Sequence, residues 1–330
     1  MFLLPPSGEL AAARAAAAPS GAPRVLGVTA TACAVRETNE VLFRELEQAC
    51  AAYPSLSVVL NVFDAPGVAP SAADPAASHS LGCPAHQTPN ATMPACVAWV
   101  ARVPGMKAAF WRYAVGEAAV RDARADIVWL FDNQMGVGAF DLRRAAATLL
   151  ASGVAIAQPR VPPKMPNAVW KKGGAGEFLG LAASVPLQPA GCRAQAVTYV
   201  EVQTPMLTAA AYVAVHRRLF ERLDMSIFNQ TIYGLDWTWC KLAEVHRDAW
   251  DTTQQRQRGV QRAACAVLDS TISRHELPST IDAVGKSKSV RNGAASFPWL
   301  AAHFPGSFVD VGDFERQRLR NERGECLLYE

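Results

Sequence analysis

The sequence predicts an α/β fold in which helices cover both faces of a mostly parallel central sheet. Short apolar runs alternate with amphipathic segments between residues 24 and 268. The run Ile-Val-Trp-Leu-Phe after Asp126 is apolar at both odd and even positions, as expected of a strand that is covered on both faces. Of the 330 residues, 50% are hydrophobic, which is enough for a large core. Strand–helix alternation at these spacings indicates an α/β/α sandwich.

The chain is expected to form one domain with irregular segments at its ends. Residues 1–23 are rich in Ala and Pro without amphipathic order, which predicts a disordered arm. The domain is expected over residues 24–310. Within it, residues 65–95 are rich in Pro, Ala, Ser and Gly and predict a long surface excursion. Residues 311–330 are expected to be a C-terminal tail.

Regular elements follow from the spacing of the apolar residues. Asp141 and Thr208 are expected to cap helices, and Gly153 is expected to end one. Short apolar runs predict strands at 25–29, 56–63, 126–131, 154–157, 197–202 and 265–268. Helical spacing of apolar residues predicts helices at 37–53, 106–121, 142–152, 208–223 and 235–245.

Composition and motif content exclude several classes of protein. The formal net charge is only +3 at pH 7, so the chain lacks the basic field that drives nucleic-acid binding. No run of about 18 apolar residues is present, so no membrane span is expected in this chain. The phosphate-binding pattern G-x-x-x-x-G-K-[ST] is missing, and no G-x-G-x-x-G follows the first strand. This argues against the P-loop and dinucleotide-binding classes.

The eight cysteines are scattered along the chain, and no two form a C-x-x-C pair, which argues against a zinc site. Cys83 and Cys96 flank the Pro-rich excursion and are candidates to pair in an oxidising compartment. Several other cysteines lie in apolar runs, where a free thiol packs as a small hydrophobic group. Two glycosylation sequons, at Asn90 and Asn229, fit a secretory route.

Asp132 directly follows the most apolar strand and marks the expected ligand site. In open α/β sheets, ligands bind beyond the carboxyl ends of the strands. The sequence Met-Gly-Val-Gly at 135–138 then offers backbone that can approach a ligand closely. The alternative is an Asp that only satisfies the amides of a turn.

Four segments of the chain, in this order, resemble a known family. They read ADIVWLFDNQMGV at 125–137, IAQP at 156–159, YVEVQTPML at 199–207, and YGLD at 233–236 leading to VLDS at 267–270 and His275. Over about residues 100–280 the chain resembles the plant and algal family catalogued as domain of unknown function 707. That family is in turn similar to nucleotide-sugar transferases with the glycosyltransferase-A fold. The resemblance implies a glycosyltransferase-A-like (Rossmann-like) fold and a sugar-transfer reaction.

The resemblance also implies a metal site with one departure from the family pattern. In that fold an acidic D-x-D motif at a strand end holds Mn²⁺ or Mg²⁺, which bridges the diphosphate of the donor. The family's Asp-Glu-Asp reads Asp132-Asn133-Gln134 here. Asp132 and His275 are the implied metal ligands, with Asp269 as an alternative partner that orients His275. Gln134 offers only an uncharged amide oxygen, which weakens a site for a hard cation.

Asp236 is the candidate catalytic base, because it matches the family's Gly-Leu-Asp and a carboxylate can take the proton of an acceptor hydroxyl. The same residue is equally suited to cap the helix that begins there. Glu201 and Gln203 are expected on the acceptor side, since polar residues rarely lie inside an apolar strand without a partner. Trp237 is a candidate to stack on a sugar.

Lys107 and Arg112, on the helix expected at 106–121, are candidates to bind the phosphates of the donor together with Asp132 and Gln134. The alternative for both cations is ordinary solvated surface charge.

The function predicted from these residues is transfer of a sugar from a uridine or guanosine diphosphate donor to a glycan or another hydroxyl acceptor. The alternative is a catalytically silent nucleotide- or carbohydrate-binding protein of the same fold, which Gln134 in place of the second acidic residue favours. The family resemblance and the two sequons point to the secretory pathway or the Golgi lumen.

Overall fold

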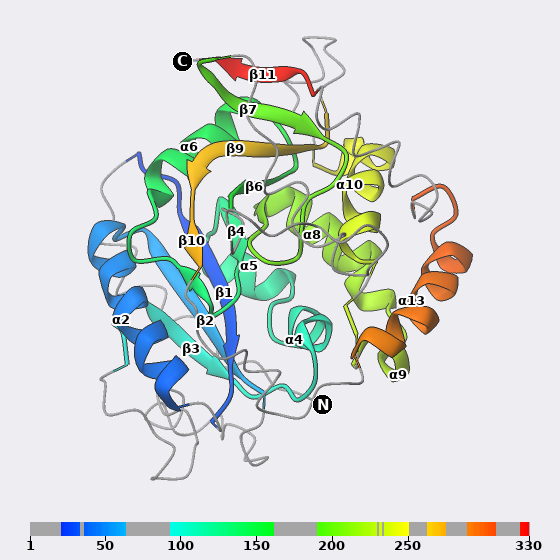
Figure 1. Ribbon diagram of the computed structural model, residues 1–330, viewed down its shortest axis with the longest axis horizontal. Coiled ribbons are helices and arrows are strands. Elements are labelled where there is room, and N and C mark those ends of the chain that lie inside the picture. Colours follow the sequence, from blue (N-terminus) through cyan, green and yellow to red (C-terminus); the bar gives the residue numbers. More distant parts are fainter. Residues whose placement is uncertain are drawn as a thin grey trace, which may run out of the picture.

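The computed structural model describes residues 21–33, 36–63, 93–161, 190–229, 231–232, 234–250, 263–274, 289–307 and 324–329. Within these residues, one nine-stranded sheet has the strand order β11-β7-β9-β6-β8-β4-β1-β2-β3 (Figure 1). A separate two-stranded sheet pairs β10 with β5.

Four parallel strands form one half of the large sheet. β1 (Val25–Thr31) pairs on one side with β2 (Leu56–Val62) and on the other with β4 (Ile127–Leu130). β2 pairs in turn with β3 (Val97–Ala101). The chain therefore moves outward from β1 to β3 and returns to the opposite side of β1 for β4. This reversal of strand order is a topological switch point.

The other half of the sheet mixes strand directions. β8 (Met206–Thr208) is antiparallel to both β4 and β6 (Ile156–Arg160), whereas β9 (Cys265–Thr271) is parallel to β6. β7 (Cys192–Val197) and β11 (Cys326–Tyr329) complete this edge in antiparallel pairs. The predicted α/β class with a mostly parallel central sheet is confirmed.

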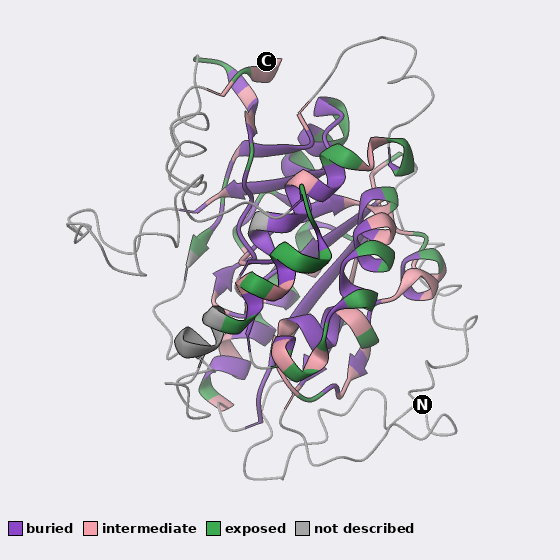
Figure 2. Ribbon diagram, turned by 90° about the vertical axis from the view of Figure 1, so that its right-hand side faces the viewer, coloured by how far each residue is buried: buried purple, intermediate pink, exposed green. Residues whose placement is uncertain are grey.

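Helices cover both faces of the sheet, and the buried residues lie between these layers (Figures 1 and 2). Residues of β4 alternate between the two sides. Ile127 and Trp129 pack in one apolar cluster with α2 (Arg36–Ala52) and α6 (Leu142–Ser152). Val128 and Leu130 pack in another with α4 (Lys107–Tyr113), α8 (Ala209–Arg218) and α10 (Asp236–Val245).

The α-helices of the described residues are α2 (Arg36–Ala52), α4 (Lys107–Tyr113), α5 (Glu117–Asp122), α6 (Leu142–Ser152), α8 (Ala209–Arg218), α9 (Met225–Phe228), α10 (Asp236–Val245) and α13 (Ser289–His303). Two short 3-10 helices lie at Phe220–Arg222 and Arg247–Ala249. None of the described helices has the length and hydropathy that a bilayer-spanning helix needs.

The predicted helix ends are confirmed by their local hydrogen bonds. The Asp141 carboxylate accepts from Arg144 N–H at 3.0 Å, and the Thr208 hydroxyl accepts from Ala211 N–H at 3.3 Å. Gly153 ends α6 in the left-handed region with φ of 71°. The Asp141 and Thr208 side chains satisfy backbone amides that the first turn of a helix leaves without a partner, and Gly153 adopts the left-handed conformation that commonly ends a helix.

Three segments differ from the sequence expectation. The helix expected at 106–121 is divided into α4 and α5, because Gly116, the residue before α5, has an extended backbone conformation. The strand expected at 197–202 lies earlier, at β7, and residues 199–205 instead connect β7 to β8. The segment expected as a C-terminal tail contributes β11, which pairs with β7.

Disulfide bonds join elements on both halves of the sheet. The pairs with both cysteines among the described residues include Cys50–Cys96, Cys192–Cys326 and Cys240–Cys265. The pairing of Cys83 with Cys96 expected from their flanking positions is wrong, because Cys96 lies beside α2 and bonds to Cys50. Short sequence separation across a loop therefore did not identify the partner in space.

Candidate functional site

The carboxyl ends of β1 and β4 lie side by side at the switch point, where open α/β sheets bind their ligands. Phe131 N–H donates to the Val28 carbonyl at 3.0 Å, which keeps the chain beside β1 as β4 ends. Asp132 is the next residue. The strand predicted to end at this residue thus places Asp132 at the predicted edge of the sheet.

The Asp132 carboxylate forms an ion pair with Lys107, the first residue of α4. The Lys107 and Asp132 side chains are only 18% and 26% exposed, so solvent screens this pair less than a fully exposed one. The Lys107 Nζ also donates to the Val202 carbonyl at 3.4 Å. The structure therefore brings together two residues that were predicted for the donor site, and Lys107 is held by protein partners.

Residues 199–205, which we call the crossing segment, lead from the end of β7, where Val197 pairs with Cys265 at the start of β9, to the carboxyl end of β4. The Gln203 carbonyl accepts from Asp132 N–H at 2.9 Å, and the Pro205 carbonyl accepts from Leu130 N–H at 2.9 Å. Further along β4, the Trp129 indole donates to the Thr204 hydroxyl at 3.0 Å. The end of the crossing segment is thus fixed to the strand that carries Asp132.

The middle of the crossing segment is fixed to β6. Glu201 N–H donates to the Gln158 Oε1 at 2.5 Å, and both side chains are almost fully buried, with 2% and 0% exposed. The Gln158 amide nitrogen has no hydrogen-bond partner among the described residues. Buried polar groups at this position keep the crossing segment in one register.

Asp236 is the first residue of α10 and is 7% exposed. The Tyr199 hydroxyl donates to the Asp236 Oδ2 at 2.7 Å, and the Trp239 indole donates to the Val200 carbonyl at 2.8 Å. The residue at the N-cap position is Leu235, and no side-chain cap bond is formed. Helix capping therefore does not account for Asp236, which instead faces the start of the crossing segment.

The crossing segment connects Asp132 with Asp236. Its Gln203 contacts Asp132, and its Tyr199 contacts Asp236. Four residue steps separate these two contacts, and an extended chain spans at most about 3.6 Å per step, so the Cα atoms of Tyr199 and Gln203 lie within about 14 Å of each other. The crossing segment therefore links the predicted donor carboxylate to the predicted base, and their membership of one site stays a prediction.

The chain beyond Asp132 forms β5, which pairs with a strand near the end of the described residues that follow β9. Gln134 is partly buried and precedes β5 (Met135–Gly136). β5 pairs antiparallel with β10 (Ser273–Arg274), which follows β9. His275 lies outside the described residues, directly after β10 in the sequence. Its predicted role stays a prediction.

The described residues around Asp132 do not fit a divalent cation well. Asp132 is the one carboxylate among Asp132, Asn133 and Gln134, and it is already ion-paired with the Lys107 ammonium. No cluster of three or more His, Cys, Asp or Glu side chains suited to a metal occurs in the described part of the chain. A hard cation would have to displace Lys107 and accept neutral amide ligands, which is unfavourable.

The remaining predicted site residues differ in what holds them. The Arg112 guanidinium donates to the Leu223 carbonyl at 2.5 Å, which fixes it to the chain between α8 and α9. Glu201 is buried and Gln203 is half-buried, both on the crossing segment. Trp237 lies on α10, but its side chain lies outside the described residues.

Sequence reasoning missed three contacts of these segments. Tyr199 and Gln158 lay within recognised segments, but neither had an assigned role; a polar residue inside the apolar run of β6 was the available signal for Gln158. Asp269, expected near His275, forms an ion pair with Arg144 of α6. That pair joins residues 125 positions apart, and no local pattern predicts it.

No protein-family model and no curated protein matches this chain. Among solved structures, the chain is similar to TarS of S. aureus, residues 1–349, with a TM-score of 0.40 and 12% identity over 91% of this chain and 70% of that one. It is also similar to glucosyl-3-phosphoglycerate synthase from Mycobacterium tuberculosis in complex with Mn²⁺, UDP-glucose and phosphoglyceric acid. That match has a TM-score of 0.39 and 13% identity over 93% and 86% of the two chains. The galactosyltransferase LgtC, in complex with donor and acceptor sugar analogues, matches with a TM-score of 0.32 and 12% identity over 89% and 99%.

Proposed function

We propose that this chain is a glycosyltransferase that moves a sugar from a nucleoside diphosphate donor to a hydroxyl acceptor. One observation carries the proposal. A lysine–aspartate pair at the switch point and a buried carboxylate on α10 are joined by one short segment of chain. The pair provides a cation for a diphosphate at the ligand-binding edge of the sheet, and Asp236 provides a base for an acceptor.

Lys107 is the residue proposed to bind the diphosphate. An ammonium has three donor protons, and the Asp132 carboxylate and the Val202 carbonyl hold it at the carboxyl edge. A fixed positive charge in a partly shielded site stabilises the negative charge that grows on a departing diphosphate. In this proposal Asp132 positions Lys107, because the pair is already formed.

Asp236 is the residue proposed to act on the acceptor. Its carboxylate takes the proton of an acceptor hydroxyl while that oxygen forms a bond to the anomeric carbon of the sugar. The bond from this carbon to the diphosphate oxygen breaks, and the nucleoside diphosphate leaves with the electron pair. The Tyr199 hydroxyl holds one carboxylate oxygen and thereby orients the other. Glu201 and Gln203 are proposed to lie on the acceptor side, and a uridine or guanosine donor is proposed from the family resemblance.

The second candidate function is a nucleotide- or carbohydrate-binding protein without turnover. Gln134 in place of an acid and the neutralisation of Asp132 by Lys107 favour it, because both features reduce the affinity for a catalytic cation.

Ligand-induced stabilisation tests the donor site. Uridine or guanosine diphosphate at about 100 times its dissociation constant should stabilise the fold by about 2.7 kcal/mol, measured as a higher melting temperature. Lys107→Gln should abolish this shift. The matched control is Lys241→Gln, which removes a lysine from an exposed ion pair with Glu244 and should leave the shift unchanged.

The two carboxylates can be separated in the same assay. Asp132→Asn should weaken nucleotide binding less than Lys107→Gln does, because the Val202 carbonyl still holds the ammonium. The opposite order would indicate that Asp132 itself holds a cation. Asp236→Asn should preserve binding and remove sugar transfer. Binding in the wild-type chain without consumption of any sugar nucleotide would establish the silent binder instead.

A further inference from the structure

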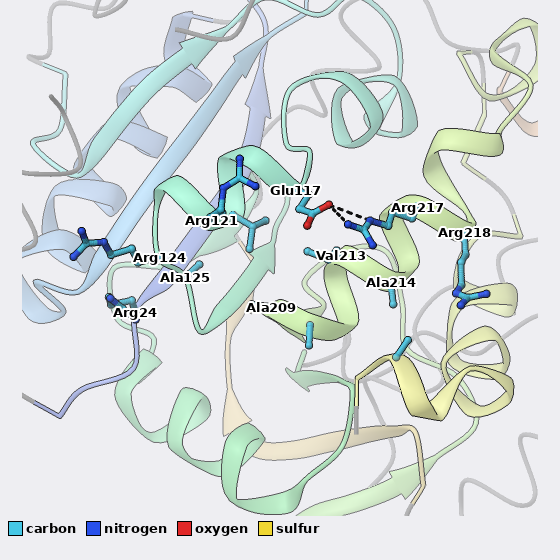
Figure 3. Close-up of a pocket in the computed structure, with 13 residues that line it drawn as sticks. Arg24, Glu117, Arg121, Arg124, Ala125, Ala209, Val213, Ala214, Arg217 and Arg218 are labelled. Carbon is cyan, nitrogen blue, oxygen red and sulfur yellow. Dashed lines mark hydrogen bonds and ion pairs between the residues drawn. The ribbon is translucent and has the colours of Figure 1, made fainter. Parts of the chain in front are cut away.

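A basic pocket lies at the opposite, amino-terminal edge of the sheet. It has a volume of about 570 Å³ and is formed by α5, α8 and the residues that precede β1 and β4 (Figure 3). Its polar lining residues are one glutamate, Glu117, and five arginines, Arg24, Arg121, Arg124, Arg217 and Arg218. β1 has seven residues, so this pocket lies roughly 20 Å from the carboxyl edge.

The arginines approach the pocket from two sides. In Figure 3, Arg24, Arg121 and Arg124 lie on one side, Arg217 and Arg218 of α8 lie on the other, and small side chains of α8 lie between them. A ligand with a single charge would meet one side only. Two sets of guanidinium groups across a hollow match a ligand that carries two or more anionic groups.

Acidic neighbours neutralise only part of this charge. Glu117 forms two hydrogen bonds with the Arg217 guanidinium, one of them at 3.0 Å. Asp126 accepts from both the backbone N–H and the side chain of Arg24, and Arg121 has a long contact of 3.9 Å with the neighbouring Asp122.

Arg124 and Arg218 form no ion pair within the described residues, so five arginines face three carboxylates. The charge of Arg218 also extends to His246 at the end of α10. The pKa of His246 is lowered mainly by burial and, as the second cause, by the charge of Arg218.

Arg124 has a φ of 47°, a left-handed conformation that Gly or Asn adopts at lower cost. An exposed arginine at this turn therefore has no local structural advantage.

The floor of the pocket is apolar and made of small side chains. Val120 and Val213 lie there with five alanines. Small residues leave the hollow open, and their methyl groups can cover the non-polar part of a ligand.

We propose that this pocket is a second ligand site, which binds an organic diphosphate through the arginines on its two sides and the apolar part of the ligand through the alanine floor. Phosphate groups accept paired hydrogen bonds from guanidinium groups, and arginine stays charged at any physiological pH. The shared chemistry fits a nucleoside diphosphate or an isoprenoid diphosphate. The site does not depend on the proposed transferase activity, because it shares no residue with the carboxyl edge.

Calorimetric titration of the full chain at low salt tests the proposal, with inorganic pyrophosphate, adenosine diphosphate and farnesyl diphosphate as probes. At least one organic diphosphate should bind tenfold or more tightly than pyrophosphate, and the preferred probe identifies the source. Equal binding of all three would contradict a role for the apolar floor. Absence of binding for every probe at millimolar concentration would overturn the site.

Charge variants show whether binding occurs in this pocket. Arg124→Gln/Arg218→Gln should weaken binding at least tenfold. The control, Arg36→Gln/Arg44→Gln, removes the same charge from α2 on the other face of the sheet and should change binding less than twofold.

A third variant acts in the opposite direction. Glu117→Gln releases Arg217 from an exposed ion pair and should tighten binding several-fold without unfolding the chain. Binding that is insensitive to these arginines but is lost in Lys107→Gln would assign the ligand to the carboxyl edge and refute the second site.

Discussion

Replacing Tyr199 by Phe removes one hydroxyl from the contact that holds Asp236. The hydrogen bond is 2.7 Å long, and its acceptor is a carboxylate in a residue that is 7% exposed. A hydrogen bond to a charged group contributes about 1.5–3 kcal/mol, because its loss leaves the buried charge less well solvated. Tyr199→Phe should therefore lower the free energy of unfolding by about 1.5–3 kcal/mol, measured by urea denaturation with an unchanged m-value.

Tyr212→Phe is the matched control for this change. Tyr212 is fully buried, and its hydroxyl donates to the neutral Val115 carbonyl at 2.8 Å. A bond of this neutral kind contributes about 0.5–1.5 kcal/mol. Both variants delete the same atom and keep the ring in place, so their difference reports the charge of the acceptor. If Tyr199→Phe cost no more than Tyr212→Phe, the Tyr199 hydroxyl would not hold a charged Asp236, and its orienting role would fail.

Three further predictions concern the scaffold. Gly234→Ala should destabilise the fold by about 2–4 kcal/mol, because Gly234 has a φ of 91° and an added Cβ would lie 2.6 Å from a leucine of α13; a wild-type urea midpoint would contradict this. Replacing both Cys240 and Cys265 by Ser should cost about 3.5 kcal/mol from loop entropy, and a denaturation midpoint insensitive to reductant would refute that bridge. Burial lowers the pKa of His216, while a carbonyl contact and the Glu221 charge partly oppose it. As the pH falls, His216 therefore binds a proton in the unfolded chain before it does so in the folded chain. The stability contributed by this lowered pKa is present above about pH 6.5 and declines as the pH falls toward the folded pKa. The free energy of unfolding of His216→Asn should decline less than that of the wild type between pH 7.5 and 5.5.

The sequence predicted the buried strands well where a long apolar run signalled them. β4 is covered on both faces, and its run of Ile127 to Leu130 has no polar interruption. β8 has only three residues, which is too short a run to detect. β3 has five apolar residues, but it comes directly after the Pro-rich excursion and was not predicted. The break at Gly116 was also missed, because one glycine inside an otherwise helical pattern is tolerated in many helices.

The candidate site was predicted one residue at a time, and its connections were not. Asp132 was located by the rule for strand ends, and Asp236 by its motif. The ion pair of Lys107 with Asp132 and the bond of Tyr199 to Asp236 join residues 25 and 37 positions apart. Such pairs depend on how the crossing segment lies over the sheet, and a periodic pattern carries no information about that path.

In the proposed donor site, the lysine beside Asp132 changes the role of the strand end. A lone carboxylate at a sheet edge repels a diphosphate unless a cation lies between them, and this requirement usually makes an acidic strand end a metal site. Here Lys107 pairs with Asp132 and keeps donor protons for another oxygen. The pair as a whole is neutral, and adding a phosphate leaves one ammonium between two acceptors. If Lys107 holds the donor diphosphate as proposed, no second acid is needed at Gln134, and the proposal accounts for both the ion pair and the amide at this position.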